Sequence, residues 1–314
     1  MLGRTACDLF WMWRYLERSE NTARLVDAAF RLTLTRSKNT EKEWMSVLAT
    51  LGCTDAYINR HDQIITDKVV DFLLRDKANP ASVMSMQTRA RENARRTRTA
   101  LTLDLWEAIN EAWIELKQVC QRPIPNAAIP EVLAVIRRQA AIVCGCMHGT
   151  LLRNDIYYFC EIGRLIERSD NTARILNAKY NTLVTTIASG GPPGANSQWD
   201  MLLRSLSAER AFYWKHEGDS SADLIAHFLI LDIEMPRSLA HCYRQLVAQL
   251  NGLNQHYGGE APPSCDLAKA FDDSLRDITI AGIKRLGLKT FLSGFLPNNA
   301  ELAQQIELDY RFKA

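Results

Sequence analysis

The side chains with the richest chemistry in this sequence occur twice, in the same order. The segment Glu-Arg-Ser-Glu-Asn-Thr-Ala-Arg spans residues 17–24, and Glu-Arg-Ser-Asp-Asn-Thr-Ala-Arg spans residues 167–174. A guanidinium holds a carboxylate or phosphate through two parallel hydrogen bonds, and Glu and Asn orient an amine or amide. The positions that carry this chemistry are Glu17, Arg18, Asn21 and Arg24 in the first copy and Glu167, Arg168, Asn171 and Arg174 in the second. The functional interpretation of this pattern is a polar site at the centre of the helical bundle that holds an anionic substrate.

The same side chains also suit a structural role. Glu17 would pair with Arg24 or Arg174, and the second copy would form the reciprocal pair. Such a lattice fixes the register of two helices and binds nothing, since buried ion pairs can specify an arrangement while adding little net stability. We favour this structural interpretation, because an interface between two related helices requires a duplicated motif. The binding interpretation stays open beside it.

Each copy of the motif is predicted to lie on a helix. At helical spacing, residues 16, 23, 26 and 30 form an apolar stripe, and Glu17, Asn21 and Arg24 form a narrow polar stripe beside it. Residues 166, 173, 176 and 180 repeat the apolar stripe. The simplest packing would set the two polar stripes next to each other around a pseudo-twofold axis.

The duplication extends beyond the motif. Residues 14–30 and 164–180 align at a constant separation of 150 residues, with nine identities in seventeen positions. Residues 44–51 match 199–206, and 72–76 match 228–232, at separations of 155 and 156. We therefore predict one domain over residues 1–314 that contains pseudo-repeats at about 1–125 and 150–298.

No segment shows the alternating pattern of a strand, so the sequence predicts an all-α fold, a helical bundle of two pseudo-symmetric halves built from an internal duplication. Prolines mark several helix starts, because proline is tolerated in a first turn. The predicted helices after the first repeat include ones that start at Pro80, Pro130 and Pro236, one or two over residues 266–295, and a closing helix over residues 299–310.

Composition points to a globular protein with no electrostatic preference for nucleic acid. Apolar residues make up 47% of the 314 residues, and the net charge is +2. The one basic run, over residues 89–98, is interpreted as a solvated helix face partly paired with carboxylates. The N-terminus lacks the features of a signal peptide, and no uncharged helical window is long enough to cross a bilayer. A cytoplasmic protein with no nucleic-acid or membrane partner is predicted.

Common catalytic and cofactor motifs are missing from the sequence. There is no Walker loop, G-x-G-x-x-G, H-E-x-x-H or G-x-S-x-G, and no His follows a Glu by three residues. The one cluster of potential metal ligands is Cys144-x-Cys146 with His148, in an apolar window that favours buried packing. We expect neither a metal nor a cofactor.

The paired motifs resemble the bacterial alpha-E family. The resemblance rests on residues 16–24 and 166–174, together with 90–95, 105–110 and 228–232, and it covers nearly the whole chain. It implies an all-helical protein in which Glu17, Arg18, Asn21 and Arg24, and Glu167, Arg168, Asn171 and Arg174, are the motif residues. The sequence departs from the family pattern at Trp13, where the second copy has the usual Gly163. A Trp there would close a gap that a Gly leaves for close helix approach, so we expect the two motif sites to differ.

Members of that family typically occur beside, or fused to, a circularly permuted ATP-grasp protein, often with a transglutaminase-like peptidase and sometimes with a proteasome-like one. The resemblance thus implies a system that forms amide or peptide bonds with ATP. Within it this chain would be a non-catalytic partner subunit that helps bind or position substrate. The alternatives are an independent enzyme with Glu17 or Glu167 as general base, and a structural scaffold. Trp113 or Trp214 would mark the partner surface if exposed, although buried packing is the expected use of both.

Overall fold

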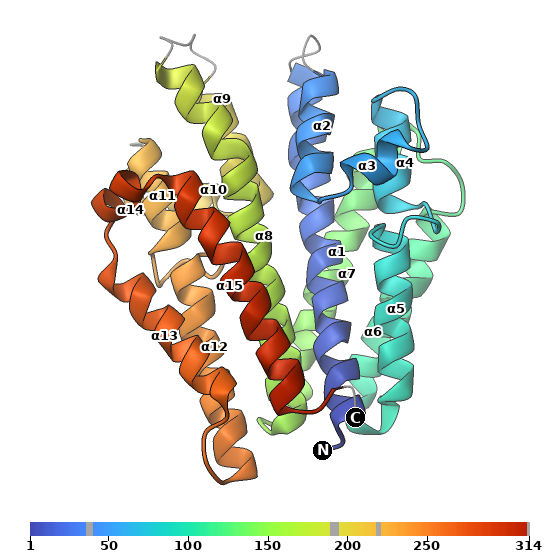
Figure 1. Cartoon of the computed structure of the whole chain (residues 1–314). Coiled ribbons are helices and arrows are strands. Elements are labelled where there is room, and N and C mark those ends of the chain that lie inside the picture. Colours follow the sequence, from blue (N-terminus) through green and yellow to red (C-terminus); the bar gives the residue numbers. More distant parts are fainter. Residues whose placement is uncertain (36–39, 189–194, 218–220, 313–314) are drawn as a thin grey trace. The chain divides into compact units, whose positions relative to one another are not determined.

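The computed structural model describes residues 1–35, 40–188, 195–217 and 221–312, and these residues form fifteen α-helices and no strand (Figure 1). The all-α fold predicted from the sequence is confirmed. The chain divides into two compact units, Met1–Arg164 and Leu165–Ala314. The long helix α8 (Asp155–Ala188) contributes its first turns to the first unit and its remainder to the second.

The first unit is built around the helix that carries the first motif. This helix, α1 (Gly3–Thr35), packs against α2, α4, α5 and α7, and α6 packs against α5 and α7. The helices that follow α1 are α2 (Thr40–Thr50), α3 (Thr54–Ile58), α4 (Thr66–Leu74), α5 (Val83–Arg96), α6 (Leu103–Val119) and α7 (Ile129–Thr150).

In the second unit, α12 packs on α13, and α13 and α14 pack on α15. Its helices after α8 are α9 (Ala195–Ser205), α10 (Glu209–His216), α11 (Ala222–Ile230), α12 (Leu239–Tyr257), α13 (Pro263–Asp277), α14 (Ile280–Leu286) and α15 (Leu288–Asp309). The glycines and prolines at residues 190–194 favour a loop between α8 and α9, but residues 189–194 lie outside the described residues.

Serine caps place two helix starts later than the prolines predicted. Helices α5 and α12 begin at Val83 and Leu239, three residues after Pro80 and Pro236. The backbone at Ser82 and Ser238 is extended. The Ser82 hydroxyl accepts a hydrogen bond from the amide of Ser85, and the Ser238 hydroxyl accepts one from the amide of His241. A side-chain oxygen at this position satisfies an amide that the helix itself leaves without a partner.

The predicted separate closing helix is wrong. Helix α15 starts at Leu288 and runs through Pro297 without a break. Proline removes one backbone donor from a helix interior and usually favours a break there. Burial of Leu292, Phe295 and Leu302 along the same helix, which packs on α13, outweighs that local cost.

Each unit contains a small cluster of three rings. In the first unit, the ring centroids of Tyr57 and His61 are 4.6 Å apart, and Tyr57 and Phe72 meet edge to face at 5.2 Å. In the second unit, Phe212 and His216 are also 4.6 Å apart, and Phe212 and Phe228 meet at 5.4 Å. Such offset or edge-to-face contacts are the favoured arrangements of aromatic rings.

Within the first unit, the start of α8 approaches the backbone of α1 very closely. A Cβ atom at Gly163 would lie 2.3 Å from the carbonyl oxygen of Phe10, a distance that real Cβ atoms do not reach. Phe10 and Gly163 are both buried. Only glycine therefore permits this contact between α1 and α8.

Substitution of Gly163 by Ala should lower the free energy of unfolding by about 1–3 kcal/mol, because the added methyl group must push the two helices apart. Gly145 is a matched control, since it lies inside α7 and a Cβ there meets nothing within 4 Å. Gly145→Ala should stabilise the protein by up to about 1 kcal/mol, because alanine has the higher helix propensity. Chemical denaturation checks both values, and equal effects would contradict the close approach.

Candidate functional site

The first motif copy lies on α1 with its polar residues mostly buried. Glu17 is 3% exposed and Asn21 is 2% exposed, while Arg18 and Arg24 are partly exposed. Arg24 forms a hydrogen-bonded ion pair with Glu20, one helical turn before it. The structure therefore uses the variable fourth position of the motif, and not only the four predicted residues.

The second copy lies on the part of α8 that belongs to the second unit. Glu167 and Asn171 are buried, Arg168 is partly exposed and Arg174 is exposed. Arg174 forms an ion pair with Asp170 through Nε at 2.6 Å, again one turn before it. Both copies thus join their last arginine to an acidic residue on the same helix, a common pairing at this spacing.

The motif hydroxyls of the second copy, which the sequence did not single out, hold other segments of the second unit. Ser169 donates to the side-chain oxygen of Asn299 at 2.9 Å, and Thr172 donates to the carbonyl oxygen of Arg237 at 2.8 Å. Asn299 also accepts from Tyr243 and donates to the carbonyl oxygen of Ile166. All these bonds are buried, so Ser169 and Thr172 position α8 against α15 and the start of α12.

A buried ion pair lies just before the second motif, in the first unit. Arg164 donates two hydrogen bonds to Glu161, at 2.8 and 2.6 Å, and both residues are less than 10% exposed. Burial alone would lower the pKa of the Arg164 guanidinium, but its bonds to Glu161 and the nearby charges of Glu161 and Glu17 raise that pKa instead. Glu17 of the first motif therefore contributes to the same charged cluster.

Two further side chains form the edge of this cluster. His148 Nε2 lies 3.6 Å from Glu161, and His148 Nδ1 lies 3.3 Å from the Tyr157 hydroxyl. Burial and the charge of Glu161 raise the pKa of Tyr157. The sequence signal for the cluster was the three-residue spacing of Glu161 and Arg164 in an otherwise apolar stretch, which places both on one helix face.

The corresponding positions of α1 are filled differently. Arg14 stands 150 residues before Arg164, and its guanidinium lies 4.5 Å from the ring centroid of Trp11, which takes the place of Glu161. At these positions α1 therefore has a cation over an indole face. The two motif copies therefore differ in their immediate surroundings, as the exchange of Trp13 and Gly163 in the sequence predicted.

The buried thiols have the chemistry of packing residues. Burial raises the pKa of Cys53 to about 11 and that of Cys120 to about 12, and it also raises the pKa of Cys160. A nucleophilic cysteine needs the opposite shift, because the thiolate is the reactive form. Cys144 and Cys146 join no group of potential metal ligands within the described residues.

The basic run on α5 is largely engaged with neighbours. Arg96 pairs with Asp8 at 2.8 Å, Arg91 donates to Asn110 and stacks on Trp113, and Arg89 lies 5.8 Å from the Tyr15 ring centroid. This arrangement agrees with the partly paired helix face that the sequence predicted. Of the two tryptophans considered as surface markers, Trp113 is partly exposed, and Trp214 is 81% exposed, so burial was the wrong expectation for Trp214.

The two kinds of ion pair predict very different costs of substitution. Arg164→Met should lower the free energy of unfolding by about 3–5 kcal/mol, because it leaves the Glu161 carboxylate buried without its cation. Arg174→Met removes a pair whose guanidinium is exposed to solvent, and it should cost less than about 1 kcal/mol. Urea denaturation of the two variants measures the difference.

The double variant Glu161→Gln, Arg164→Met provides the control. Removing both charges should recover part of the loss, since the cost comes from an unpaired buried charge and not from the absence of the pair. Similar losses for Arg164→Met and Arg174→Met would show that the cluster is accessible to water.

Comparison with known proteins finds relatives in mycobacteria. The chain is 24% identical over 318 aligned positions to the uncharacterised protein Mb2597 of Mycobacterium bovis and to the uncharacterised proteins MT2643 and Rv2567 of Mycobacterium tuberculosis. The alignments cover 93% of this chain but 35% of each relative, so the chain spans about a third of their length. No solved structure matches the chain.

A family model described as a predicted α-helical domain with a conserved ER motif matches residues 1–310. Both motif copies begin with that Glu-Arg pair, on α1 and on α8. With nearly all of its length matched, the chain belongs to the Alpha-E family.

Proposed function

We propose that this chain is a non-catalytic helical partner of an ATP-grasp amide or peptide ligase in the cytoplasm, and that it helps bind or position the substrate. The observation that carries the proposal is the length of the relatives. The chain aligns with only 35% of each of them, so in those proteins the helical domain is one part of a longer polypeptide. The ligase itself is inferred from the company that the family typically keeps, which can include a transglutaminase-like peptidase.

The chemistry of the motif side chains supports a non-catalytic role. Arg24 and Arg174 are joined to acidic residues on their own helices, and Ser169 and Thr172 hold neighbouring segments. Burial raises the pKa of the Cys120 and Cys160 thiols, which disfavours either as a nucleophile. A protein of this kind contributes a surface or a substrate contact to a ligase that brings its own nucleotide site.

We also propose that the two units are copies of one ancestral helical unit. Beyond the aligned motif, the ring cluster of Tyr57, His61 and Phe72 recurs as Phe212, His216 and Phe228 at separations of 155 or 156 residues. Helices α2 and α9 have eleven residues each, and α4 and α11 have nine each.

Smaller details support the same duplication. Gly52 and Ser207, 155 residues apart, both have positive φ, 66° and 53°. An ion pair between Arg60 and Asp76 at 3.1 Å has its counterpart in Lys215 and Asp232 at 2.7 Å. A left-handed backbone is uncommon at a serine. That Ser207 keeps the conformation of Gly52 is therefore specific support for a shared ancestor.

The partner role is tested by affinity purification of the tagged protein from its own host. We expect an ATP-grasp protein to co-elute in near-equal amount, and ATP turnover with amino acids to appear only in the complex. Recovery of the protein alone would contradict the proposal. Turnover by the isolated protein that Glu17→Gln or Glu167→Gln abolishes, without loss of folding, would instead indicate an enzyme.

The same variants separate substrate positioning from a scaffold role. If the chain positions substrate, Glu17→Gln or Glu167→Gln should raise the KM of the complex for the amino-acid substrate. A scaffold would show a lower melting temperature with unchanged turnover. Glu115→Gln is the matched control, because it makes the same chemical change outside the motif. Glu115 forms a solvent-exposed ion pair with Arg138.

A further inference from the structure

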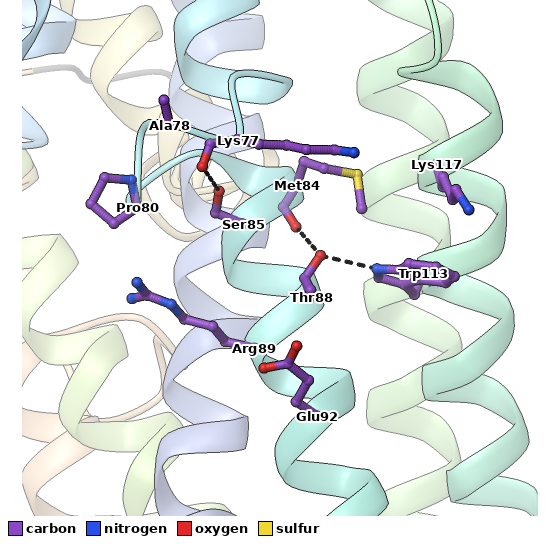
Figure 2. A pocket seen from close by; sticks show the side chains of 10 residues that line it. All are labelled: Lys77, Ala78, Pro80, Met84, Ser85, Thr88, Arg89, Glu92, Trp113 and Lys117. Atoms are coloured by element: carbon purple, nitrogen blue, oxygen red, sulfur yellow. Dashed lines mark hydrogen bonds between the residues drawn. The ribbon is translucent and has the colours of Figure 1, made fainter.

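We infer that a groove in the first unit is a docking site for an acidic, partly apolar segment of a protein partner. The groove lies beside α5, between the loop before that helix and the exposed side of α6, and it has a volume of about 660 Å³ (Figure 2). Three of its lining residues are cations, Lys77, Arg89 and Lys117, and one, Glu92, is an anion. The inference deepens the proposed partner role and rests on it for the identity of the partner.

The cations of this groove form no ion pair within the described residues, whereas several other cations of the first unit do. Arg31, Arg60, Arg75, Arg96, Arg137 and Arg138 each pair with a carboxylate of that unit. Lys77, Arg89 and Lys117 do not, and all three are exposed. Their charges are available to an incoming anion, and like charges near one another favour its binding.

An indole and a thioether provide the apolar part of the groove. Trp113 on α6 donates from Nε1 to the Thr88 hydroxyl at 3.0 Å, and Thr88 donates to the Met84 carbonyl oxygen at 2.8 Å (Figure 2). These two bonds fix the indole against α5. The ammonium of Lys117 lies 5.0 Å from the Trp113 ring centroid, so a positive charge stands directly beside an apolar surface.

The loop that carries Lys77 is held in place before any partner arrives. Arg60 bonds to the Asp76 carboxylate and to the Ala78 carbonyl oxygen, at 3.1 and 3.0 Å. The buried Asn79 side chain donates to the carbonyl oxygen of Phe72 at 2.9 Å. A preformed rim reduces the entropy lost on binding and therefore favours affinity.

The form of the groove favours a polypeptide segment over a small molecule. Six of its ten lining residues are exposed and only Met84 is buried, so the site is an open channel with a charged rim. Small-molecule pockets usually enclose most of their ligand. An extended segment can lie along such a channel, with carboxylates against the lysines and an apolar side chain against Trp113 and Met84.

The corresponding place in the second unit has a groove lined by two cations, Arg244 and Arg276, where the groove of the first unit has three. Ile233 stands 156 residues after Lys77, and the groove beside it, of about 350 Å³, includes the buried carboxylate of Asp272. Arg276 pairs with that carboxylate. The groove of the first unit is therefore the more basic of the two, and its three cations are not paired with its carboxylate.

Fluorescence anisotropy of a labelled peptide of alternating Glu and Phe tests the inference on the full chain. We expect binding that weakens with added salt, and none to the same peptide with Gln in place of Glu. The double variant Lys77→Glu, Lys117→Glu should lose at least about tenfold in affinity, as expected when attraction at two contacts becomes repulsion. The double variant Lys42→Glu, Lys289→Glu, at exposed lysines outside the groove, should bind as the unaltered protein does.

Three results would overturn the inference. They are equal binding of the Gln peptide, equal losses in the two double variants, and full displacement of the peptide by free glutamate at matched concentration, which would indicate a small-anion site. Purification of the ligase with each variant separates this inference from the partner role. A partner that still co-elutes with the groove variant, while the peptide fails to bind, removes the groove from the interface and leaves the partner role intact.

Discussion

The first unit depends on placing charge where water does not reach. Glu161 and Arg164 sit beside Glu17 at the point where α8 meets α1, and this meeting is possible only because Gly163 lets the helix rest on the backbone at Phe10. Close helix contact excludes solvent, and exclusion of solvent makes each charge dependent on the others. The motif, the glycine and the ion pair before it are therefore parts of one arrangement. A substitution at the glycine or at one of the charges therefore changes the solvation or the pairing of the remaining buried charges.

This view changes the meaning of the Glu-Arg motif. Its last arginine pairs within its own helix in both copies, and in the second copy its hydroxyls hold Asn299 and the Arg237 backbone. Three exposed cations of the first unit, in contrast, lie on α5, on α6 and on the loop before α5, around a tryptophan. In this chain the last arginine of each motif copy and the hydroxyls of the second copy therefore hold the domain together, and the partner site that we propose lies elsewhere.

The sequence predicted the fold class, because helical periodicity and the missing strand pattern are local properties. It also predicted a difference between the motif copies, since Trp13 and Gly163 differ in volume. It missed Ser169 and Thr172 as structural residues, because their partners Asn299 and Arg237 lie far away in the chain. The continuity of α15 through Pro297 was missed for a similar reason: local propensity favours a break, and packing on α13 overrides it. The groove at Trp113 has no recognisable sequence motif, because its residues come from three separate segments that meet only in the folded chain.

The long-range bonds of the two units also have a consequence for the order in which the chain folds during synthesis. In the first unit, Asp8 accepts a hydrogen bond from Arg96, 88 positions later. All residues of this unit have been synthesised once Arg164 has left the ribosome. In the second unit, Ser169 can donate its hydrogen bond to Asn299 only after a further 130 residues have been synthesised. Domains generally fold as they emerge. The first unit can thus be complete while the motif on α8 still lacks its hydrogen-bond partner, which is made only with α15.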